Sequence, residues 1–567
     1  MKNQELAQIF NEIADLLEMK EVQFKPRAYR KAAQNIESLG EDVEDVYKRG
    51  ELKKIPGIGK SIAEKIEEFL ENGKVQKLED LKEETPVDIE NLTSVETLGP
   101  KKIKVLHQEL QIKNLDDLEK AAKERKIRNL EGFGKKTEEN ILENISFAKK
   151  SKQRFLLGYV SPEAKEIKNA LKKHVDKIEI AGSLRRKKET IGDVDILAVT
   201  SNAKDVMNFF TSLDKVKKVM AKGETKSSVR LYGGIQVDLR IVKEESFGSA
   251  LQYFTGSKDH NIEIRKIAQK NNFKLNEYGL FKNDKQIAGE TEEEIYETLG
   301  MNWVPPELRE NNGEVDAANE NNLPDLVEYS DVKGDLQMHS NWSDGSNTIE
   351  EMVEEAINLG HEFIAFTDHV GSLKVAGGMD IDELEKQAKK INQVRDRYDD
   401  IHIFHGVEAN IMKDGKIDVS DDLLDIADVV LASIHSAFRM DEKEMTNRVI
   451  NAISNDYVGI YSHPTGRKIQ KKEPIKLDLE KVIDAAIDKD VALEINAYPE
   501  RLDLNDAHVR QVVERGGKLS IGTDAHRKDH LRYYELGISV ARRGWAEKDD
   551  IINTYSVDKL KKTFNKI

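Results

Sequence analysis

Three aspartates in strand-like segments constrain the fold of this chain more than any other feature. Asp193 and Asp195 lie two residues apart, so on a strand both carboxylates point to the same face. A second alternating run, residues 235–240, carries Asp238. Close carboxylates repel each other unless a cation lies between them, and Mg²⁺ prefers hard oxygen ligands. The pattern predicts a two-metal phosphoryl-transfer site; the competing interpretation is a solvated strand edge with surface aspartates.

The segment just before these aspartates has the character of a phosphate-binding turn. Gly182 and Ser183 precede a short predicted helix, and Gly-rich turns before helices present backbone N–H groups to phosphates. The Gly182 backbone, Ser183 and Arg186 would neutralise charge on departing phosphates. We therefore expect a nucleotidyltransferase site in this part of the chain.

Composition limits the class of protein without identifying its partner. A chain of 567 residues is too long for one core, and the absence of cysteine excludes disulfides and thiolate metal sites. The net charge of -16 argues against nucleic acid, but residues 25–31, 101–104 and 185–188 are locally basic. No apolar stretch has membrane-spanning length. We expect a cytoplasmic, nucleoid-associated protein without membrane contact.

Residues 1–150 have helical periodicity interrupted by three glycine turns. Each turn resembles a helix-hairpin-helix, in which glycines permit the bend and the next helix presents free N–H groups to a DNA phosphate. Such turns hold the DNA backbone without reading sequence. Thr97 replaces a glycine in the second turn, which weakens its expected grip. The predicted DNA-binding residues here are Gly57, Gly59, Lys60, Gly99, Lys101, Gly132, Gly134 and Lys135.

Residues 1–320 resemble the X family of DNA polymerases, which includes polymerases of the beta type. The palm signature is matched by Gly182, Ser183, Arg186, Asp193 and Asp195, with Asp238 as the third carboxylate. The resemblance implies that Thr225 and Lys226 contact DNA phosphates. It also implies a nucleotide pocket formed by Tyr253, Phe254, Gly256, Asn261 and Arg265. Lys258 stands where the family has an aspartate, so the nucleotide contacts are expected to differ.

The N-terminal part resembles the small lyase domain of the same family. Lys65 aligns with the lysine that forms a Schiff base with the sugar at an abasic site, and Lys25 with a phosphate-binding lysine. Lysine can attack an aldehyde where burial or nearby cations lower its pKa. Ser61 replaces another cation of the family, and Lys65 as an ordinary DNA-phosphate or surface lysine remains the alternative interpretation.

From residue 334 onward, β-branched runs alternate with helical segments, as in an α/β barrel. The segment resembles a PHP (polymerase and histidinol phosphatase) domain, whose fold is a distorted (β/α)7 barrel with ligands at successive strand ends. Gln337 replaces the first histidine of the family's metal set, so we expect one metal to bind weakly or to be missing. The implied metal ligands are Gln337, His339, Asp344, His369, Glu408, His435, His463, Asp524 and His526.

The expected architecture is multidomain. It comprises α-helical helix-hairpin-helix domains, an α+β nucleotidyltransferase palm with a thumb, and the barrel. The boundaries that we expect are 1–85 (lyase-like), 86–152 (fingers-like), 153–243 (palm), 244–312 (nucleotide-selection thumb), 313–332 (linker) and 333–567 (PHP domain).

The two resemblances together imply a monomeric DNA repair polymerase that fills short gaps. They imply gapped or nicked DNA and deoxynucleoside triphosphates as partners, with Mg²⁺ at the polymerase site. For the barrel they imply a 3′–5′ exonuclease or abasic-site endonuclease that uses Mn²⁺ or Zn²⁺. Two alternatives stay open: a small-molecule phosphoesterase with a DNA-targeting half, and a non-catalytic DNA-end-binding scaffold.

Overall fold

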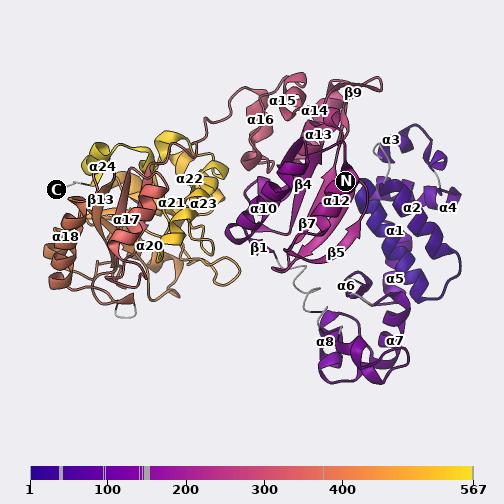
Figure 1. The fold of residues 1–567 in the computed structure, drawn as a ribbon, viewed down its shortest axis with the longest axis horizontal. Helices are drawn as coiled ribbons and strands as arrows, with labels where there is room; N and C mark the ends of the chain where they lie inside the picture. The colour runs from indigo at the N-terminus through magenta and orange to yellow at the C-terminus, as the bar shows by residue number, and fades with distance from the viewer. Residues whose placement is uncertain are drawn as a thin grey trace. The chain divides into compact units, whose positions relative to one another are not determined.

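The computed structural model describes residues 2–37, 43–55, 57–93, 95, 98–139, 141–142, 145, 154–373 and 376–564 (Figure 1). Thr97, singled out above, lies outside these residues. The chain forms two compact units. The first comprises residues 1–155, 170–181 and 192–299, and the second comprises residues 156–169, 182–191 and 300–567.

The first unit begins with a helical region whose apolar faces pack together. Leu6, Phe10 and Ile13 follow helical spacing and are fully buried, and the first helix packs along the second. Figure 1 shows these helices in indigo and violet. Its elements are α1 (Lys2–Met19), α2 (Lys25–Glu37), α3 (Val43–Lys48), η1 (Leu52–Lys54), α4 (Lys60–Asn72), α5 (Gln76–Glu84), α6 (Ile89–Thr93), α7 (Pro100–Leu110), α8 (Leu115–Lys123) and η2 (Ile127–Asn129).

A five-stranded sheet follows in the same unit. Its order is β2-β4-β7-β6-β5, with β4 and β7 parallel and the other neighbours antiparallel. Helices α12 and α13 pack on it, and Leu197 and Ala250 belong to its core. The elements are β2 (Lys177–Ile180), β4 (Asp193–Val199), α12 (Ala203–Thr211), β5 (Val216–Lys222), β6 (Lys226–Leu231), β7 (Gln236–Ile241), η4 (Glu244–Ser246) and α13 (Phe247–Thr255).

A small mixed subdomain completes the first unit. Three antiparallel strands, in the order β10-β9-β8, contact helices α13, α14 and α15. The further elements are α14 (Lys258–Lys270), β8 (Lys274–Asn276), β9 (Gly279–Lys282), β10 (Lys285–Ala288) and α15 (Glu292–Thr298).

The second unit confirms the predicted (β/α)7 barrel. Seven strands, all parallel to their neighbours, run in the chain order β11 to β17. A parallel bridge between Met338 and Ala525 brings the first and last strands together. The strands are β11 (Gly334–Met338), β12 (Phe363–Phe366), β13 (His402–Asn410), β14 (Val429–Ser433), β15 (Val458–Tyr461), β16 (Ala492–Asn496) and β17 (Leu519–Gly522).

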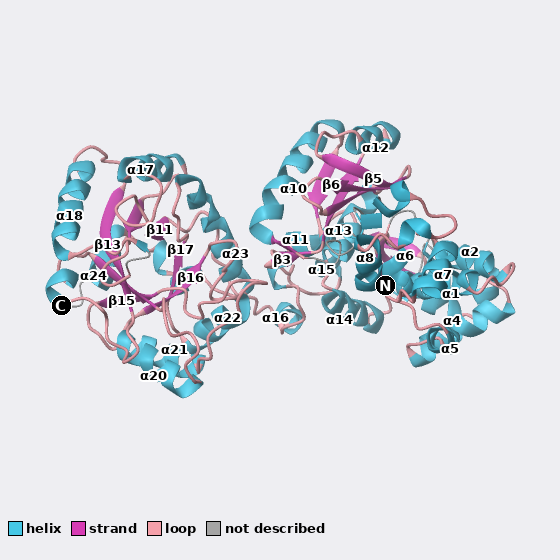
Figure 2. Ribbon diagram, turned by 90° about the horizontal axis from the view of Figure 1, so that it is seen from below, coloured by secondary structure: helices cyan, strands magenta, loops and turns pink. Residues whose placement is uncertain are grey.

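Helices lie around these strands, because one face of each is apolar and packs on the barrel (Figure 2). Thr348 and Asp380 cap two of them with reciprocal side-chain and backbone hydrogen bonds. The helices are α17 (Ile349–Asn358), α18 (Ile381–Arg395), α19 (Asp421–Leu424), α20 (Glu442–Ile453), α21 (Leu479–Asp488), α22 (Asp506–Arg515), η7 (Lys528–Tyr533), α23 (Tyr534–Arg543), η8 (Lys548–Asp550), η9 (Ile552–Thr554) and α24 (Val557–Phe564).

Several segments outside residues 333–567 belong to the second unit. Residues 313–332, expected as a linker, contain α16 (Glu314–Asn319) and bury Leu326 and Val327; the Val327 N–H donates to the Ala546 carbonyl at 3.0 Å. Residues 156–169 and 182–191 also belong to it. The remaining elements are β1 (Phe155–Leu156), α10 (Leu157–Leu171), η3 (Lys172–His174), α11 (Gly182–Arg185), β3 (Thr190–Ile191) and η5 (Pro306–Leu308).

The start of the barrel generates a stability prediction. A Cβ on Gly334 would lie 1.9 Å from the Phe363 carbonyl oxygen of the neighbouring strand, whose backbone cannot move away freely. Gly334→Ala should lower the free energy of unfolding of the barrel by about 1–3 kcal/mol or more. Scanning calorimetry measures this as a lower barrel transition.

Gly459→Ala is the matched control in the same barrel. Its added carbon meets Cδ1 of the Phe564 ring at 3.1 Å, and a ring can rotate aside. Equal losses of stability for both variants would contradict the packing described for β11.

Candidate active sites

The three aspartates meet on two neighbouring strands of the first unit. β4 and β7 run parallel in a register that pairs Asp195 directly with Asp238. Asp193 lies two residues earlier on the same face of β4. Gln236 Nε2 donates to Asp238 Oδ1 at 2.9 Å, and Lys226 Nζ lies 3.1 Å from Asp238 Oδ2. The structure thus gathers three carboxylates at one edge, with one lysine against them.

The electrostatics of this group favour a bound cation. Burial, reinforced by the charges of Asp193 and Asp238, raises the pKa of Asp195 to about 7. Burial and Asp238 also raise the pKa of Asp193. The carboxylates therefore resist joint ionisation, and a divalent cation would relieve their repulsion. The three aspartates fit a metal site, and the charge of Lys226 partly neutralises their negative charge here.

The predicted nucleotide pocket lies where α13 ends and α14 begins. The rings of Tyr253 and Phe254 are 5.1 Å apart in an edge-to-face arrangement. Gly256 adopts a φ of 70°, which permits the turn between the helices. Asn261 Nδ2 donates to the Tyr253 carbonyl at 2.8 Å, and Arg265 Nε donates to the Asn261 carbonyl at 3.2 Å. The structure thus brings these predicted residues together.

The Gly182–Arg186 turn belongs to the second unit. Arg186 Nε donates to Glu310 Oε1 at 2.9 Å, and Arg543 Nη1 donates to the Arg186 carbonyl at 2.7 Å. Burial would raise the pKa of Glu310, but the charges of Arg186, Arg543 and Lys188 outweigh it and hold the pKa below its ordinary value. Arg186, the predicted phosphate ligand, is therefore paired with an acid in this structure.

Two of the glycine turns open directly into helices. Gly59 and Gly99 precede α4 and α7 with extended backbone, and no side chain caps either helix. Added Cβ atoms at Gly59, Gly99 or Gly134 would meet nothing within 4 Å. Lys60, Lys101 and Lys135 are exposed. This geometry leaves both helix starts accessible to a phosphate.

The remaining predicted residues of the N-terminal region lie on helices α2 and α4. Lys25 is exposed at the first position of α2. Lys65 Nζ, on α4, donates to the Ser61 carbonyl at 3.1 Å and to its Oγ at 3.3 Å. Lys65 is thus held by Ser61, the residue that replaces a family cation.

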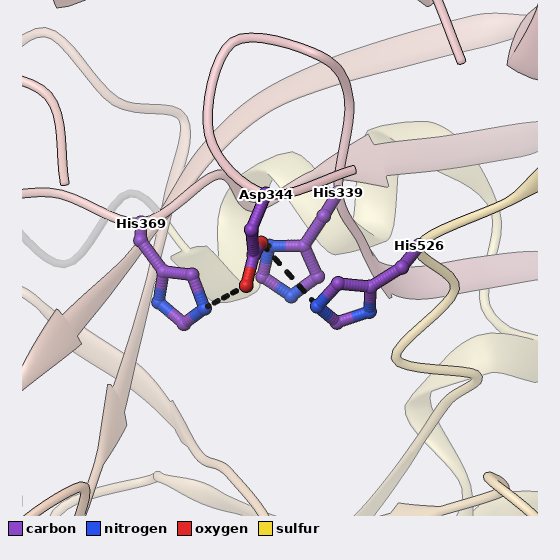
Figure 3. A group of neighbouring side chains, drawn as sticks. All are labelled: His339, Asp344, His369 and His526. Atoms are coloured by element: carbon purple, nitrogen blue, oxygen red, sulfur yellow. Dashed lines mark ion pairs between the residues drawn. The ribbon is translucent and has the colours of Figure 1, made fainter. Parts of the chain in front are cut away.

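The barrel gathers the predicted histidine and acid ligands at the carboxyl ends of the strands, where barrel active sites form. Figure 3 shows Asp344 between His339, His369 and His526. The distances from Asp344 oxygens to His526 Nε2, His369 Nε2 and His339 Nδ1 are 3.3, 3.8 and 3.9 Å. One ligand atom from each of the four residues lies within 4.8 Å of the others. This is a compact mixed nitrogen and oxygen group.

A second group shares His369 with the first. His369, Glu408 and His435 also lie within 4.8 Å of one another. His463 Nε2 lies 3.0 Å from Glu408 Oε1, and Asp524 Oδ1 lies 3.3 Å from His339 Nε2. Eight of the nine predicted positions therefore converge, and two metal positions that share a ligand account for this geometry.

Imidazole nitrogens without hydrogen-bond partners show that the barrel site fits metal ions. Both ring nitrogens of His339 and Nδ1 of His369 are buried and have no hydrogen-bond partner among the described residues. Burial lowers the pKa of His369 to about 4, so it is neutral at pH 7, as a ligand must be. Burial lowers the pKa of His526, but pairing with Asp344 and Asp524 outweighs burial and raises the pKa to about 9. Metal binding would displace the proton that His526 then carries at pH 7.

Gln337, the ninth position, is fully buried and packs against Glu494 and Ser462. With its amide oriented so that the nitrogen and the oxygen both find partners, its nitrogen lies 3.0 Å from Glu494 Oε2 and 3.1 Å from Ser462 Oγ. Burial raises the pKa of the Glu494 carboxyl well above its ordinary value, and its Oε2 accepts hydrogen bonds from Ser462 Oγ at 2.9 Å and from the His463 N–H at 2.7 Å. The surroundings of Gln337 are those of a hydrogen-bonded core.

Asp368 directly precedes the predicted ligand His369 but was not itself predicted as a site residue. It is fully buried, and its carboxylate accepts from the Ser340 N–H at 2.8 Å and from Ser343 Oγ at 2.6 Å. It therefore positions the loop that carries Asp344. Its place beside His369 in the sequence is the one local signal, and only the fold reveals which loop Asp368 holds.

Comparisons with protein families match four parts of the chain. Models described as a helix-hairpin-helix domain and a SAM-like helix-hairpin-helix tandem match residues 1–75 and 89–146. The DNA polymerase beta thumb matches residues 250–310, and the PHP domain matches residues 335–498.

One similar protein spans the whole chain. The DNA polymerase/3′-5′ exonuclease PolX of Bacillus subtilis is 38% identical over 567 residues, which is 98% of each chain. Two relatives match the barrel half alone. They are a probable phosphatase of Thermoanaerobacter pseudethanolicus, 29% identical over 38% of this chain and 86% of its own, and the probable phosphatase YcdX of Escherichia coli, 29% identical over 34% and 78%.

Among the described residues, the structure contains no helix that is long and apolar enough to cross a membrane.

The raised pKa of Asp195 predicts that the metal-free site lowers the free energy of unfolding by an amount that depends on pH. A folded-state pKa of about 7 exceeds the unfolded value, so stability falls as pH rises from about 4 to about 7 without metal. Asp195→Asn should remove this loss. In EDTA the variant should melt higher than the wild type near pH 8, with a much smaller difference near pH 5.

Differential scanning fluorimetry measures both melting temperatures. Saturating Mg²⁺ should stabilise the wild type more than the variant at the higher pH, because metal replaces the proton. A difference between the two proteins that does not vary with pH would contradict the electrostatic description of this site.

Proposed function

Because the chain belongs to the X family of DNA polymerases that carry a C-terminal PHP domain, we propose that it fills short gaps and trims 3′ ends during DNA repair. It is a DNA-directed DNA polymerase with a 3′–5′ exonuclease. The observation that carries the proposal is the similarity along 98% of both chains to a protein that bears both activities in its name. The paired register of Asp195 and Asp238 supports it independently.

We propose that Asp193, Asp195 and Asp238 hold the metals of nucleotidyl transfer. Divalent metals held there would lower the pKa of the primer 3′-hydroxyl and neutralise charge on the triphosphate. Lys226, 3.1 Å from Asp238, exchanges this partner for a DNA phosphate when the site is loaded. Thr225 directly precedes Lys226 in the chain and also contacts a DNA phosphate.

The nucleotide is bound by groups on two segments. The Gly182 backbone, Ser183 and Arg186 bind its phosphates, which requires Arg186 to leave Glu310. The Tyr253 and Phe254 pair lies against the incoming sugar, with Gly256 at the turn. Asn261 and Arg265 contact the base edge and the template.

In the barrel, the converging side chains bind metal and orient the DNA end. The ligands are His339, Asp344, His369, Glu408, His435, His463, Asp524 and His526; Gln337 is not one of them, so the site holds two metals rather than three. Metal ions held there would supply the Lewis acidity that activates water at neutral pH. Asp368 keeps the Asp344 loop in place.

Metal identity follows from the donor atoms. The all-oxygen carboxylate group suits Mg²⁺, whereas mixed imidazole and carboxylate ligands suit Mn²⁺ or Zn²⁺. Metal dependence of both reactions is expected on this basis.

The N-terminal turns hold the DNA backbone without reading its sequence. We propose that helix starts at Gly59–Lys60 and Gly99, with Gly57, Lys101, Gly132, Gly134 and Lys135, bind phosphates at a gap or nick. The protein acts as a monomer on gapped or nicked DNA within the nucleoid. Lys65, with Lys25 as a phosphate ligand, removes the sugar remnant of an abasic site.

A small-molecule phosphoesterase is the second candidate for the barrel. It is favoured by the two relatives named as probable phosphatases, which match this half alone. Hydrolysis of simple phosphate monoesters, without shortening of DNA, would favour this candidate over the exonuclease.

Primer assays separate the two reactions. On a short-gapped template with a 5′-labelled primer, Asp193→Ala should reduce extension by about two orders of magnitude or more, because a metal ligand is lost. His339→Ala should abolish shortening in Mn²⁺ and leave extension intact. Extension by Asp193→Ala, or shortening by His339→Ala, would refute the corresponding assignment.

Borohydride trapping tests the lyase proposal. Lys65→Ala should reduce the covalent adduct with an incised abasic substrate by about tenfold or more, because the Schiff base loses its nitrogen. Lys74→Ala, at an exposed lysine just after the same helix, is the matched control and should form the adduct. Equal trapping by the two variants would remove Lys65 from the mechanism.

A further inference from the structure

Three aromatic side chains form a group beside the metal site of the barrel. Tyr498 follows β16, and His530 and Tyr533 belong to η7, which follows β17. Ring centroids are 5.5 Å apart for Tyr498 and His530, 5.7 Å for Tyr498 and Tyr533, and 5.3 Å for His530 and Tyr533. All three side chains are partly exposed. We call them the aromatic group.

The aromatic group is tied to the metal ligand Asp524. Asn496 links the two: its Nδ2 donates to Asp524 Oδ2 at 3.2 Å, and its Oδ1 accepts from the Tyr498 N–H at 3.2 Å. His530 lies four residues after the ligand His526. β16 contacts β17 and α23, and η7 contacts α23, so the segments that carry the aromatic group are neighbours in the barrel.

An arginine stands between the aromatic group and the metal ligands. Arg501 Nε lies 3.4 Å from Asp524 Oδ2, and its backbone N–H donates to the Tyr498 carbonyl at 2.8 Å. Among the described residues, Asp524 is its one ion-pair partner. Its side chain is 20% exposed, so the planar end of the guanidinium can bind a phosphate next to the metals.

Three acids act on the aromatic group, and each is paired with a cation. Asp524 pairs with Arg501 at 3.4 Å, Glu500 with Lys471 at 2.6 Å, and Asp529 with Arg527 at 3.0 Å. His530 Nδ1 is buried without a hydrogen-bond partner among the described residues.

Packing alone does not explain this composition. A purely structural aromatic cluster would be buried, whereas these rings are partly exposed and carry polar atoms. Partly exposed aromatic rings beside a cation are the arrangement with which proteins bind single-stranded nucleic acid, by stacking on bases and pairing with phosphates. Each stacked base contributes about 1–3 kcal/mol by alanine substitution.

We propose that the aromatic group is a binding subsite for the unpaired base at the 3′ end of a DNA strand, and that Arg501 binds the phosphate on the 5′ side of that nucleotide. This subsite rests on the proposed exonuclease function and deepens it. It holds the last nucleotide by its base and the scissile phosphate by the arginine.

Paired substrates test the subsite. One 5′-labelled single strand ends in a normal nucleotide, and the other ends in a tetrahydrofuran residue that lacks a base. Tyr498→Ala should cut the normal end about tenfold more slowly and the baseless end at the wild-type rate, because only the first can stack. Tyr498→Phe, which keeps the ring, should restore cleavage of the normal end.

Two further variants sharpen the result. Arg501→Ala should slow cleavage of both ends alike, because both carry the phosphate. Tyr457→Ala is the matched control, since this tyrosine precedes β15 at the opposite end of the strands and should change neither rate. Equal slowing of both ends by Tyr498→Ala would overturn the subsite and indicate a structural role.

A binding measurement separates the subsite from the nuclease itself. A single strand with 3′-terminal 2-aminopurine, bound in Ca²⁺, should lose fluorescence with the wild type by stacking, and less with Tyr498→Ala. Quenching that depends on Tyr498 without any shortening in Mn²⁺ would support the subsite and refute the exonuclease. Shortening without such quenching would refute the subsite alone.

Discussion

Carboxylates packed close together repel one another, and buried imidazole nitrogens stay without partners, unless a cation binds between them. Both candidate sites of this chain depend on that constraint. In the first unit the register of β4 and β7 forces Asp195 against Asp238, which raises the pKa of Asp195 to about 7. In the second, His339 is fully buried without a hydrogen-bond partner among the described residues. Metal binding resolves both conflicts, so the folds are organised around ions.

The two sites bring metal ligands together on different scaffolds. A mixed sheet supplies carboxylates from adjacent strands, which suits hard ions and the transfer of a nucleotide. A barrel supplies one or two side chains from each strand end, which mixes nitrogen and oxygen ligands and suits hydrolysis. The chain thereby combines synthesis with removal of nucleotides at 3′ ends. The contacts of Arg186 with Glu310 and Arg543 show that the phosphate-binding turn packs in the same unit as the barrel.

Sequence patterns predicted much of this organisation because they are local. The spacing of Asp193 and Asp195 determines a shared face of a strand, and the strand-then-histidine pattern determines side chains at barrel strand ends. The patterns did not predict the pairing of Lys226 with Asp238 or the packing of Gln337 against Glu494. The aromatic group around Tyr498 was also missed. Each of these depends on contacts between distant segments, and spacing along the chain carries no information about them. The residues assigned to binding and catalysis stay predictions until they are varied.

The most direct test is anomalous diffraction from crystals soaked in Mn²⁺. Two separate sets of peaks are expected, one between Asp193, Asp195 and Asp238, and one within the group of His339, Asp344, His369, Glu408, His435 and His526. No peak is expected beside Gln337. Absence of peaks at either cluster, with its carboxylates held by protons or by Lys226 instead, would contradict the claim that ions organise both sites.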